Sequence, residues 1–151
     1  MDRKALFREA FRERLGTPLS ENVPLSAMSS FGIGGPADFF FEARTEEDLK
    51  KALAVAFKEK FPCYVIGGGT NILFDDAGYR GLIVRNRLEG IVREEDRLRV
   101  LAGTHLAAVV REALGAGLAG LEFLAGIPGT LGGAVSGNAG AFGAAIGDRV
   151  A

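Results

Sequence analysis

Two glycine-rich stretches contain the residues of this sequence that could hold an anionic ligand. The first, Gly67-Gly-Gly-Thr-Asn71, directly follows a short apolar run, Cys63–Ile66, that is typical of a strand. Consecutive glycines can direct several backbone N–H groups at one anion without any lysine, and Thr70 and Asn71 add side-chain donors. Ligands of open α/β sheets bind at the carboxyl ends of strands. The pattern therefore favours a phosphate-binding loop over a bare tight turn.

The second stretch covers residues 123–147, which include eight glycines and no charged side chain. It is too rich in glycine for one stable helix and too apolar for a solvated loop. Thr130 could cap a short helix over residues 131–135, whose N-terminus would then face an anion. The alternatives are a tightly packed glycine-rich core without a ligand and a signal-like apolar segment. Pro128, Asn138 and the glycines disfavour a membrane span.

Other familiar sites find little support in the sequence. The third glycine of a G-x-G-x-x-G motif would fall at Ile72, and no Gly-Lys pair exists for a P-loop. The single histidine, His105, has no acidic cluster beside it, so we expect no metal site and a surface position. The single cysteine, Cys63, is expected to be a small core residue. Glu122 is expected to accept a hydrogen bond from the backbone or a ligand, or simply to be exposed.

Three arginines near the predicted sheet leave two interpretations open. One of Arg80, Arg85 and Arg87 could reach a diphosphate, but a solvated strand edge explains them as well. The block Ser29–Pro36 is likewise either a plain loop before a strand or a backbone under geometric demand. In the second case Phe31 and Ile33 would anchor the block in a core.

Composition narrows the class of protein. The chain has 151 residues, with 18 basic and 19 acidic side chains and a net charge of −1. This balance lacks the basic surplus of nucleic-acid-binding domains, so no nucleic-acid partner is expected. A single cysteine excludes an internal disulfide and favours the cytoplasm. The first residues contain no apolar signal segment, and no membrane partner is expected. Residues 149–151 look like the beginning of a strand, which suggests part of a longer chain.

Hydrophobic periodicity predicts the elements that would position the two glycine-rich stretches. We expect helices over residues 2–15, after Thr45 and after Thr104, with each threonine as an N-cap. Leu6 and Leu114 are among the residues expected to face the core. Strands are expected at residues 37–43, 63–66, 72–74 and 81–84, followed by a hairpin of residues 91–93 and 98–102. Residues 18–24 are expected to form an extended connector. The first strands and the helix between them predict a βαβ unit.

Three blocks together resemble one enzyme family. They are residues 30–35 (Ser-Phe-Gly-Ile-Gly-Gly), residues 67–74 (Gly-Gly-Gly-Thr-Asn-Ile-Leu-Phe), and residues 120–135 with 138–143. In this order and spacing they are similar to the UDP-N-acetylenolpyruvoylglucosamine reductases, over residues 20–151. The resemblance implies an α+β, two-lobed FAD-binding fold of the vanillyl-alcohol-oxidase (PCMH) type. It divides the chain into an N-terminal helix and connector (1–19), a first lobe (20–85) and an incomplete second lobe (86–151), with the substrate domain missing.

The resemblance also implies which residues contact the cofactor. The first loop would cradle the FAD diphosphate, and the second stretch would line the diphosphate and the isoalloxazine. The cofactor-binding residues so implied are Ile66, Gly67, Gly68, Gly69, Thr70, Asn71, Ile72, Leu73, Ile127, Pro128, Gly129, Thr130, Gly132, Gly133, Ala134, Asn138, Gly140, Ala141 and Gly143. Because the first loop contains no histidine, FAD is expected to be bound non-covalently.

The family's reaction implies a cytoplasmic oxidoreductase of peptidoglycan synthesis, a process tied to cell shape and cell division. NADPH reduces FAD, the reduced flavin passes a hydride to the enolpyruvyl group of the UDP-sugar, and a serine donates the proton, with help from a glutamate and an arginine. None of these three catalytic residues maps onto residues 1–151, so this chain alone is expected to be inactive. A related flavin oxidase and a non-catalytic nucleotide-binding module are the alternatives.

Overall fold

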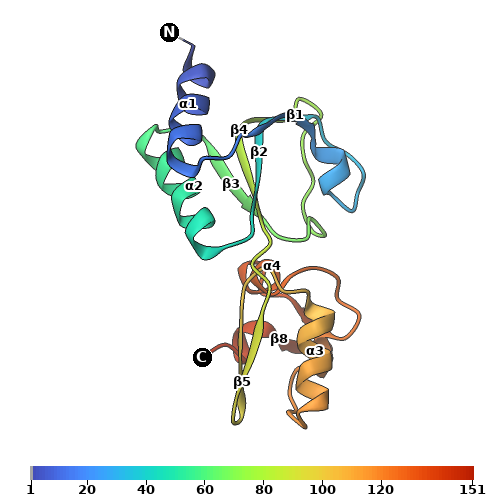
Figure 1. Cartoon of the computed structure of the whole chain (residues 1–151). Helices are drawn as coiled ribbons and strands as arrows, with labels where there is room; N and C mark the ends of the chain where they lie inside the picture. Colours follow the sequence, from blue (N-terminus) through green and yellow to red (C-terminus); the bar gives the residue numbers. More distant parts are fainter. Residues whose placement is uncertain (1) are drawn as a thin grey trace. The chain divides into compact units, whose positions relative to one another are not determined.

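The structure of the chain is a computed structural model that describes residues 2–151. Two compact units follow one another in the sequence, with the division between Asn86 and Arg87. The first unit contains a four-stranded sheet, and the second contains two small hairpins and two helices (Figure 1). Within residues 2–151, no helix is long and apolar enough to span a membrane.

The sheet of the first unit has the strand order β1-β2-β4-β3. Strand β1 (Ser20–Pro24) pairs antiparallel with β2 (Pro36–Ala43), and both β2 and β3 (Cys63–Ile66) run parallel to β4 (Tyr79–Asn86). The helix α2 (Glu46–Lys58) connects β2 to β3. The predicted βαβ unit is therefore present, with β4 inserted between its two strands.

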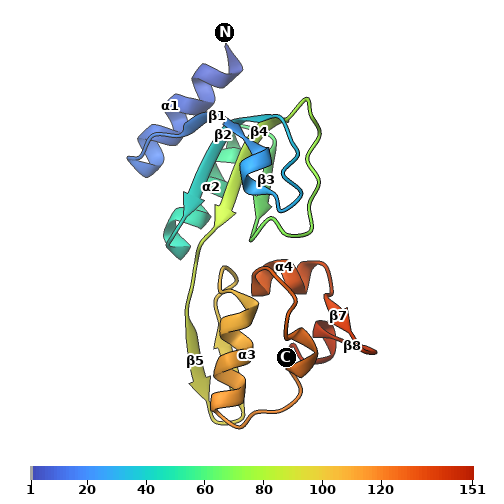
Figure 2. The ribbon, with the colours of Figure 1, turned by 90° about the vertical axis from the view of Figure 1, so that its right-hand side faces the viewer.

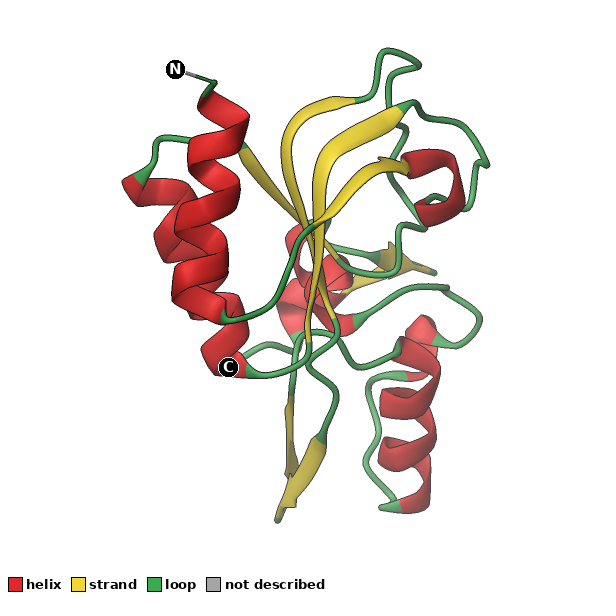
Figure 3. Cartoon of the chain, turned by 45° about the horizontal axis from the view of Figure 1, so that its top comes forward, coloured by secondary structure: helices red, strands yellow, loops and turns green. Residues whose placement is uncertain are grey.

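Two helices cover one face of this sheet (Figures 1 and 3). Helix α1 (Arg3–Leu15) begins at its N-cap Asp2 and ends at Gly16. Its Phe7 stacks on Phe61 with ring centroids 4.1 Å apart and also contacts Phe39 of β2. Thr45 caps α2, as predicted, by accepting a hydrogen bond of 3.1 Å from the Asp48 N–H. The aromatic cluster of Phe7, Phe39 and Phe61 anchors α1 to the sheet.

The opposite face of the sheet carries a second core. Its buried members come from β2, β3, β4 and the segments beside them: Leu25, Ala37, Phe40, Ile66, Phe74 and Ile83. Successive phenylalanines of β2 thus point to opposite faces, with Phe39 toward the helices and Phe40 toward this core. A strand covered on both faces explains why residues 39–41 are all apolar.

The second unit begins with the hairpin of β5 (Ile91–Glu94) and β6 (Arg97–Val100). The helices α3 (Leu106–Gly115) and α4 (Leu131–Ser136) follow, and Figure 2 shows both, with the short hairpin of β7 (Gly140–Ala141) and β8 (Ala144–Ala145). The second unit also contains two short 3₁₀ helices, η2 (Glu122–Leu124) and η3 (Ile146–Asp148). A further 3₁₀ helix, η1 (Leu25–Met28), lies in the first unit. The core of the second unit consists of Leu106, Val110, Phe123, Leu124, Ala134 and Ile146.

Several elements differ from the sequence-based expectations. Residues 20–24, expected as a connector, form strand β1 because they pair with the edge of β2. Residues 72–74, expected as a strand, have no ladder partner, and the Ile72 carbonyl instead accepts a side-chain hydrogen bond from Ser29. Residues 149–151 form no strand.

Two details of the predicted helices are also wrong. Thr104 does not cap α3, because its Oγ1 bonds to the backbone N–H and carbonyl of Gly90, and His105 takes the N-cap position. Leu6 and Leu114, expected to face the core, are 49% and 62% exposed. Both leucines fit the helical period, but the elements that pack against α1 and α3 cover only a narrow stripe of each helix.

The aromatic cluster predicts a sharp contrast between two phenylalanines. Phe7 is 1% exposed, whereas Phe57 of α2 is 87% exposed. Truncation of a buried phenylalanine leaves a cavity, so we expect Phe7→Ala to lower the free energy of unfolding by about 3–5 kcal/mol. Phe57→Ala should change it by less than about 0.5 kcal/mol. Urea unfolding of both variants tests this, and equal losses would contradict the anchoring of α1.

Candidate functional site

The first glycine loop begins where β3 ends, at Ile66, and continues through residues 67–71 without entering a helix. Its tightest point is Gly69, which has φ = +68°. A Cβ at this position would overlap the carbonyl oxygen of Met28. The residue must therefore be glycine for two independent reasons, its left-handed backbone and the close approach of another backbone.

Two serines hold this loop from the neighbouring segment. The N–H of Ser30 donates to the Gly69 carbonyl at 2.9 Å, and Ser30 Oγ donates to the Thr70 carbonyl at 3.1 Å. Ser29 Oγ donates to the Ile72 carbonyl at 2.8 Å and accepts from the Phe31 N–H at 3.2 Å. Ser29 is nearly buried. The carbonyls of the loop are thereby drawn to one side.

We call the hydrogen bonds of Ser29 and Ser30 to the carbonyls of Gly69, Thr70 and Ile72 the serine seam. The sequence analysis did not predict it. Residues 29–36 were open to two interpretations, and the structure shows a segment under geometric demand, but not one anchored by its apolar side chains. Phe31 and Ile33 are 56% and 49% exposed, so the expected core anchors are wrong. A pair of serines before a glycine-rich block, preceding a second glycine loop, is the signal that could have indicated the seam.

The N–H groups of the loop are arranged differently from its carbonyls. Across residues 2–151, the backbone N–H groups of Gly67, Gly68 and Gly69 have no hydrogen-bond acceptor in the chain. Backbone amides left without an internal acceptor at the end of a strand are suited to an anion, because a buried or half-buried N–H needs a partner. The diphosphate-binding role that the resemblance implies for this loop stays a prediction, and these amides are the donors that it would use.

The second glycine stretch is fixed by backbone hydrogen bonds to the segment that precedes α3. Leu106 N–H donates to the Gly129 carbonyl at 3.0 Å, and Leu131 N–H donates to the Thr104 carbonyl at 2.8 Å. Gly132 N–H donates to the Ala102 carbonyl at 2.8 Å. These bonds place the first turn of α4 directly beside residues 102–106, which lead into α3.

Thr130 caps α4, as the sequence predicts. It is 4% exposed, and its Oγ1 accepts a hydrogen bond of 3.4 Å from the Gly133 N–H. Within the part of the chain that the structure describes, the N–H groups of Gly129 and Thr130 have no acceptor. The second stretch therefore presents the same feature as the first, which is a fixed backbone with donors that the chain does not use.

The segment after α4 is organised by Asn138. Its Oδ1 accepts a hydrogen bond of 3.1 Å from the Gly147 N–H, while the Ile146 N–H donates to the Ala139 carbonyl at 2.9 Å. These bonds close the hairpin of β7 and β8, with Phe142 97% exposed at its turn. Asn138 has φ = +45°, a conformation that asparagine tolerates better than most residues.

The predicted cofactor residues fall into two classes. Ile66, Thr130 and Ala134 are buried, and Ile66 and Ala134 belong to the two hydrophobic cores, so their side chains are structural. Gly69 is buried as well. The other predicted cofactor residues are at least partly accessible, and Leu73 is 67% exposed. The structure gathers residues 66–73 in the first unit and residues 127–143 in the second.

The remaining candidates have little capacity for chemistry. His105 is exposed, as predicted. Burial raises the pKa of Cys63 to about 11, which keeps its thiol protonated, although the residue is only partly buried. No three His, Cys, Asp or Glu side chains of residues 2–151 gather as a metal site would require. The guanidinium of Arg80 forms an ion pair with Asp38 and donates hydrogen bonds to the carbonyls of Pro36 and Ala77.

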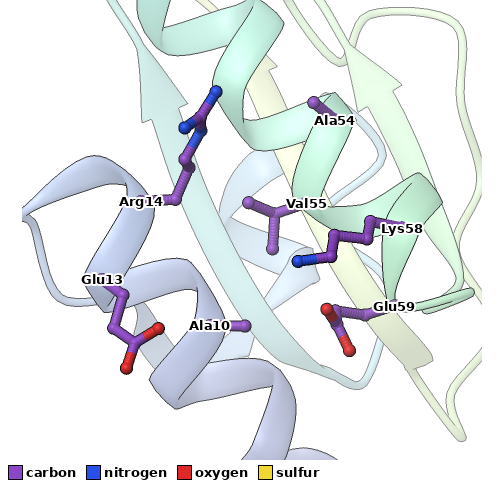
Figure 4. A pocket seen from close by; sticks show the side chains of 7 residues that line it. All are labelled: Ala10, Glu13, Arg14, Ala54, Val55, Lys58 and Glu59. Atoms are coloured by element: carbon purple, nitrogen blue, oxygen red, sulfur yellow. The ribbon is translucent and has the colours of Figure 1, made fainter.

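A hollow of about 510 Å³ lies between α1 and α2, on the helical side of the first unit (Figure 4). Its floor is formed by small apolar side chains and its rim by charged ones. The lining residues are Ala10, Glu13, Arg14, Ala54, Val55, Lys58 and Glu59. None of them belongs to a glycine loop, and the rim carries both signs of charge without a shared ligand geometry. This hollow is not the candidate site.

Comparison with known proteins gives consistent matches. Residues 37–150 match the family described as FAD binding domain. The UDP-N-acetylenolpyruvoylglucosamine reductase of Solibacter usitatus is 47% identical over 132 residues, which are 87% of this chain and 42% of that protein. The reductase of the same name from Carboxydothermus hydrogenoformans is 39% identical over 149 residues, 96% of this chain and 49% of its own length.

A solved structure agrees with these relatives. The crystal structure of UDP-N-acetylenolpyruvylglucosamine reductase (MurB) from Thermus caldophilus matches with a TM-score of 0.68 and 38% identity, covering 86% of this chain and 46% of that one. The resemblance and the FAD-binding fold predicted from the sequence are thereby confirmed. The chain spans less than half the length of the curated relatives described above.

The close approach at Gly69 predicts a difference between two glycines with the same backbone conformation. Gly16 has φ = +70° with open space around its Cα, whereas Gly69 has φ = +68° against the Met28 carbonyl. Gly16→Ala should lower the free energy of unfolding by about 1–2 kcal/mol, the cost of a left-handed alanine. Gly69→Ala should cost at least about 2 kcal/mol more because of the overlap. Urea unfolding measures both, and similar losses would contradict the contact.

Glu122 predicts a dependence of stability on pH. Hydrogen bonds from its own N–H and from the Gly120 N–H, the latter at 2.7 Å, lower the pKa of this carboxyl below 4.5, with a smaller contribution from Arg149. A depressed pKa in the folded state stabilises the fold at higher pH, and this contribution is lost as the pH falls through the folded pKa. Wild type should therefore exceed Glu122→Gln in stability near neutral pH, with the difference vanishing in acid. A difference that grew in acid would contradict this account.

Proposed function

Because this chain belongs to the FAD-binding domain family, we propose that its two glycine stretches bind FAD. The observation that carries the proposal is the set of backbone N–H groups, at Gly67–Gly69 and at Gly129–Thr130, for which residues 2–151 supply no acceptor. A diphosphate supplies several acceptor oxygens, and backbone amides of glycine loops bind such groups without a charged side chain. The residues of the first loop would hold the diphosphate.

The remaining cofactor residues are proposed on the same basis. Residues 127–134 and 138–143 would contact FAD through their backbone and small side chains, since glycine and alanine let a flat ring approach closely. No histidine lies in either stretch, so FAD would be held without a covalent bond. When bound, FAD supplies hydride transfer between a nicotinamide and a substrate. The chain's own contribution is to bind the cofactor and to fix its orientation.

The names of the relatives extend the proposal to the whole protein. They support the reduction of UDP-N-acetylenolpyruvoylglucosamine as the reaction of the whole protein. The family resemblance of the sequence motifs adds the rest of the proposal: NADPH as the reductant, UDP-N-acetylmuramate as the product, and a step of peptidoglycan synthesis in the cytoplasm. The UDP-sugar would bind to residues that this chain does not contain, because the relatives are more than twice as long as the part it matches. Residues 37–150, which match the FAD-binding family, would bind the cofactor.

Retention of flavin by the purified chain tests the proposal. After addition of FAD and desalting, the visible spectrum of the wild type should keep the flavin bands. Gly68→Asp places a negative charge in the proposed nest and should weaken FAD binding by at least about tenfold, because like charges at a binding site cost several kcal/mol. The matched control is Gly115→Asp, which adds the same charge at an exposed glycine with open space around it.

Three results are informative. Flavin lost from Gly68→Asp but retained by wild type and by Gly115→Asp supports FAD on the first loop. Equal retention by all three proteins would place FAD elsewhere. No retention by folded wild type would contradict FAD binding by this chain. Circular dichroism of each protein establishes that it is folded.

A further inference from the structure

The first glycine loop offers backbone dipoles to an anion but no formal positive charge. We propose that Arg85 supplies that charge, as a side-chain ligand of the phosphate group bound by this loop. The inference rests on the proposed FAD site and deepens it, because Arg85 is absent from the residues that sequence motifs assign to the cofactor. Three observations about Arg85 support the inference. They are its position in the sheet, the N–H donors of its guanidinium that have no strong acceptor, and its contact with Met28.

The register of the sheet places Arg85 beside the start of the loop. In the parallel ladder of β3 and β4 its Cα partner is Ile66, the residue directly before Gly67. Its partner on the other side, in β2, is Glu42. Register partners in a sheet direct their side chains to the same face. For Ile66 this is the face of the core of Leu25 and Phe74, against which Met28 also packs.

The guanidinium of Arg85 uses few of its donors within the chain. An arginine carries five N–H donors. Nη1 donates to the Met28 sulfur at 3.5 Å, and thioether sulfur is a weak acceptor. Nε is buried and has no partner among residues 2–151. A buried donor without an acceptor is rare in folded proteins and calls for a physical explanation, and a bound anion is one.

The nearest carboxylate neutralises Arg85 only in part. Glu42 Oε1 lies 3.9 Å from Arg85 Nη1, beyond hydrogen-bond distance, whereas Glu42 Oε2 accepts from Arg44 at 2.9 Å. Glu42 therefore does not serve Arg85 alone. Arg85 differs in this respect from Arg80, whose guanidinium bonds to Asp38 and two carbonyls. Arg80 has a structural role, and Arg85 keeps its charge and donors for a ligand.

Met28 links the guanidinium to the loop. Its sulfur accepts the Arg85 hydrogen bond, and its carbonyl oxygen occupies the space where Gly69 would carry a Cβ. Arg85, Met28 and Gly69 are thus a continuous series of contacts in one unit. The side chain of Arg85 is 21% exposed, so it is not sealed from solvent. Arginine forms bidentate hydrogen bonds with phosphate groups and is suited to this role.

Substitution of Arg85 by methionine separates a ligand role from a structural one. Methionine keeps a long apolar stem and removes the buried donor that lacks a partner. If Arg85 serves the ligand, Arg85→Met should bind FAD about tenfold to a hundredfold more weakly, as expected for one charge-assisted contact. Its melting temperature should equal or exceed that of wild type. Arg85→Lys, which keeps the charge without the planar fork, should bind with intermediate affinity.

Binding is measured by the quenching of flavin fluorescence, with ADP as a competitor and riboflavin as a ligand that lacks phosphate. The variant should lose affinity for FAD and ADP together and show no change toward riboflavin. The matched control is Arg14→Gln, which removes one charge at an exposed position of α1 where residues 2–151 offer no ion pair. Its affinity for FAD should stay within about twofold of wild type.

The failures of the inference and of the proposed function are distinguishable. If wild type binds FAD and Arg85→Met binds it equally well, the role of Arg85 is overturned while the FAD site stands. A lower melting temperature together with equal losses for FAD and riboflavin would show a structural role and also overturn it. If wild type binds neither FAD nor ADP, both proposals fail. Should Arg85→Met not fold, wild-type affinity in Arg85→Lys would overturn the inference.

Discussion

The contact between the backbone of Met28 and Gly69 is the constraint on which the rest of the first unit depends. Two backbones can approach this closely only where one has no side chain, and the left-handed turn at Gly69 directs the loop back toward its own sheet. The hydrogen bonds of Ser29 and Ser30 then hold the carbonyls of Gly69, Thr70 and Ile72. The N–H groups of Gly67, Gly68 and Gly69 remain without an acceptor among residues 2–151, and they are the donors that we propose for a ligand.

In the second unit, different residues fix the backbone and again leave N–H groups without an acceptor among residues 2–151. Buried threonines replace the serines: Thr130 caps α4, and Thr104 fixes the segment before α3 through Gly90. Backbone hydrogen bonds from Leu106, Leu131 and Gly132 join these segments, again leaving neighbouring N–H groups without an acceptor in the described chain. In each unit, hydrogen bonds fix the backbone and leave neighbouring N–H groups of a glycine stretch without an acceptor among residues 2–151. This accounts for the scarcity of charged residues in the glycine stretches.

The sequence predicts the parts of this architecture that depend on local signals. The phenylalanine run of β2, the cap at Thr45 and the cap at Thr130 each have a local pattern, and each is present. The partners of exposed or polar segments could not be predicted. Ser20–Pro24 reads as a connector because only its pairing with β2 makes it a strand. Thr104 resembles an N-cap, but a backbone 14 residues away takes its hydroxyl. The serine seam joins residues 39 to 43 positions apart, so the serine pair before the glycine-rich block can indicate a seam but cannot identify its partners.

The most direct test of a backbone-built FAD site is the response of individual amides. A ¹⁵N-labelled sample of the chain should be titrated with FAD while the amide resonances are followed. The account predicts that the amides of Gly67, Gly68 and Gly69 shift strongly, with those of Gly129 and Thr130, while Ala54 in the hollow between α1 and α2 stays unchanged. Shifts at Ala54 and Val55 without shifts at the glycine loops would contradict it.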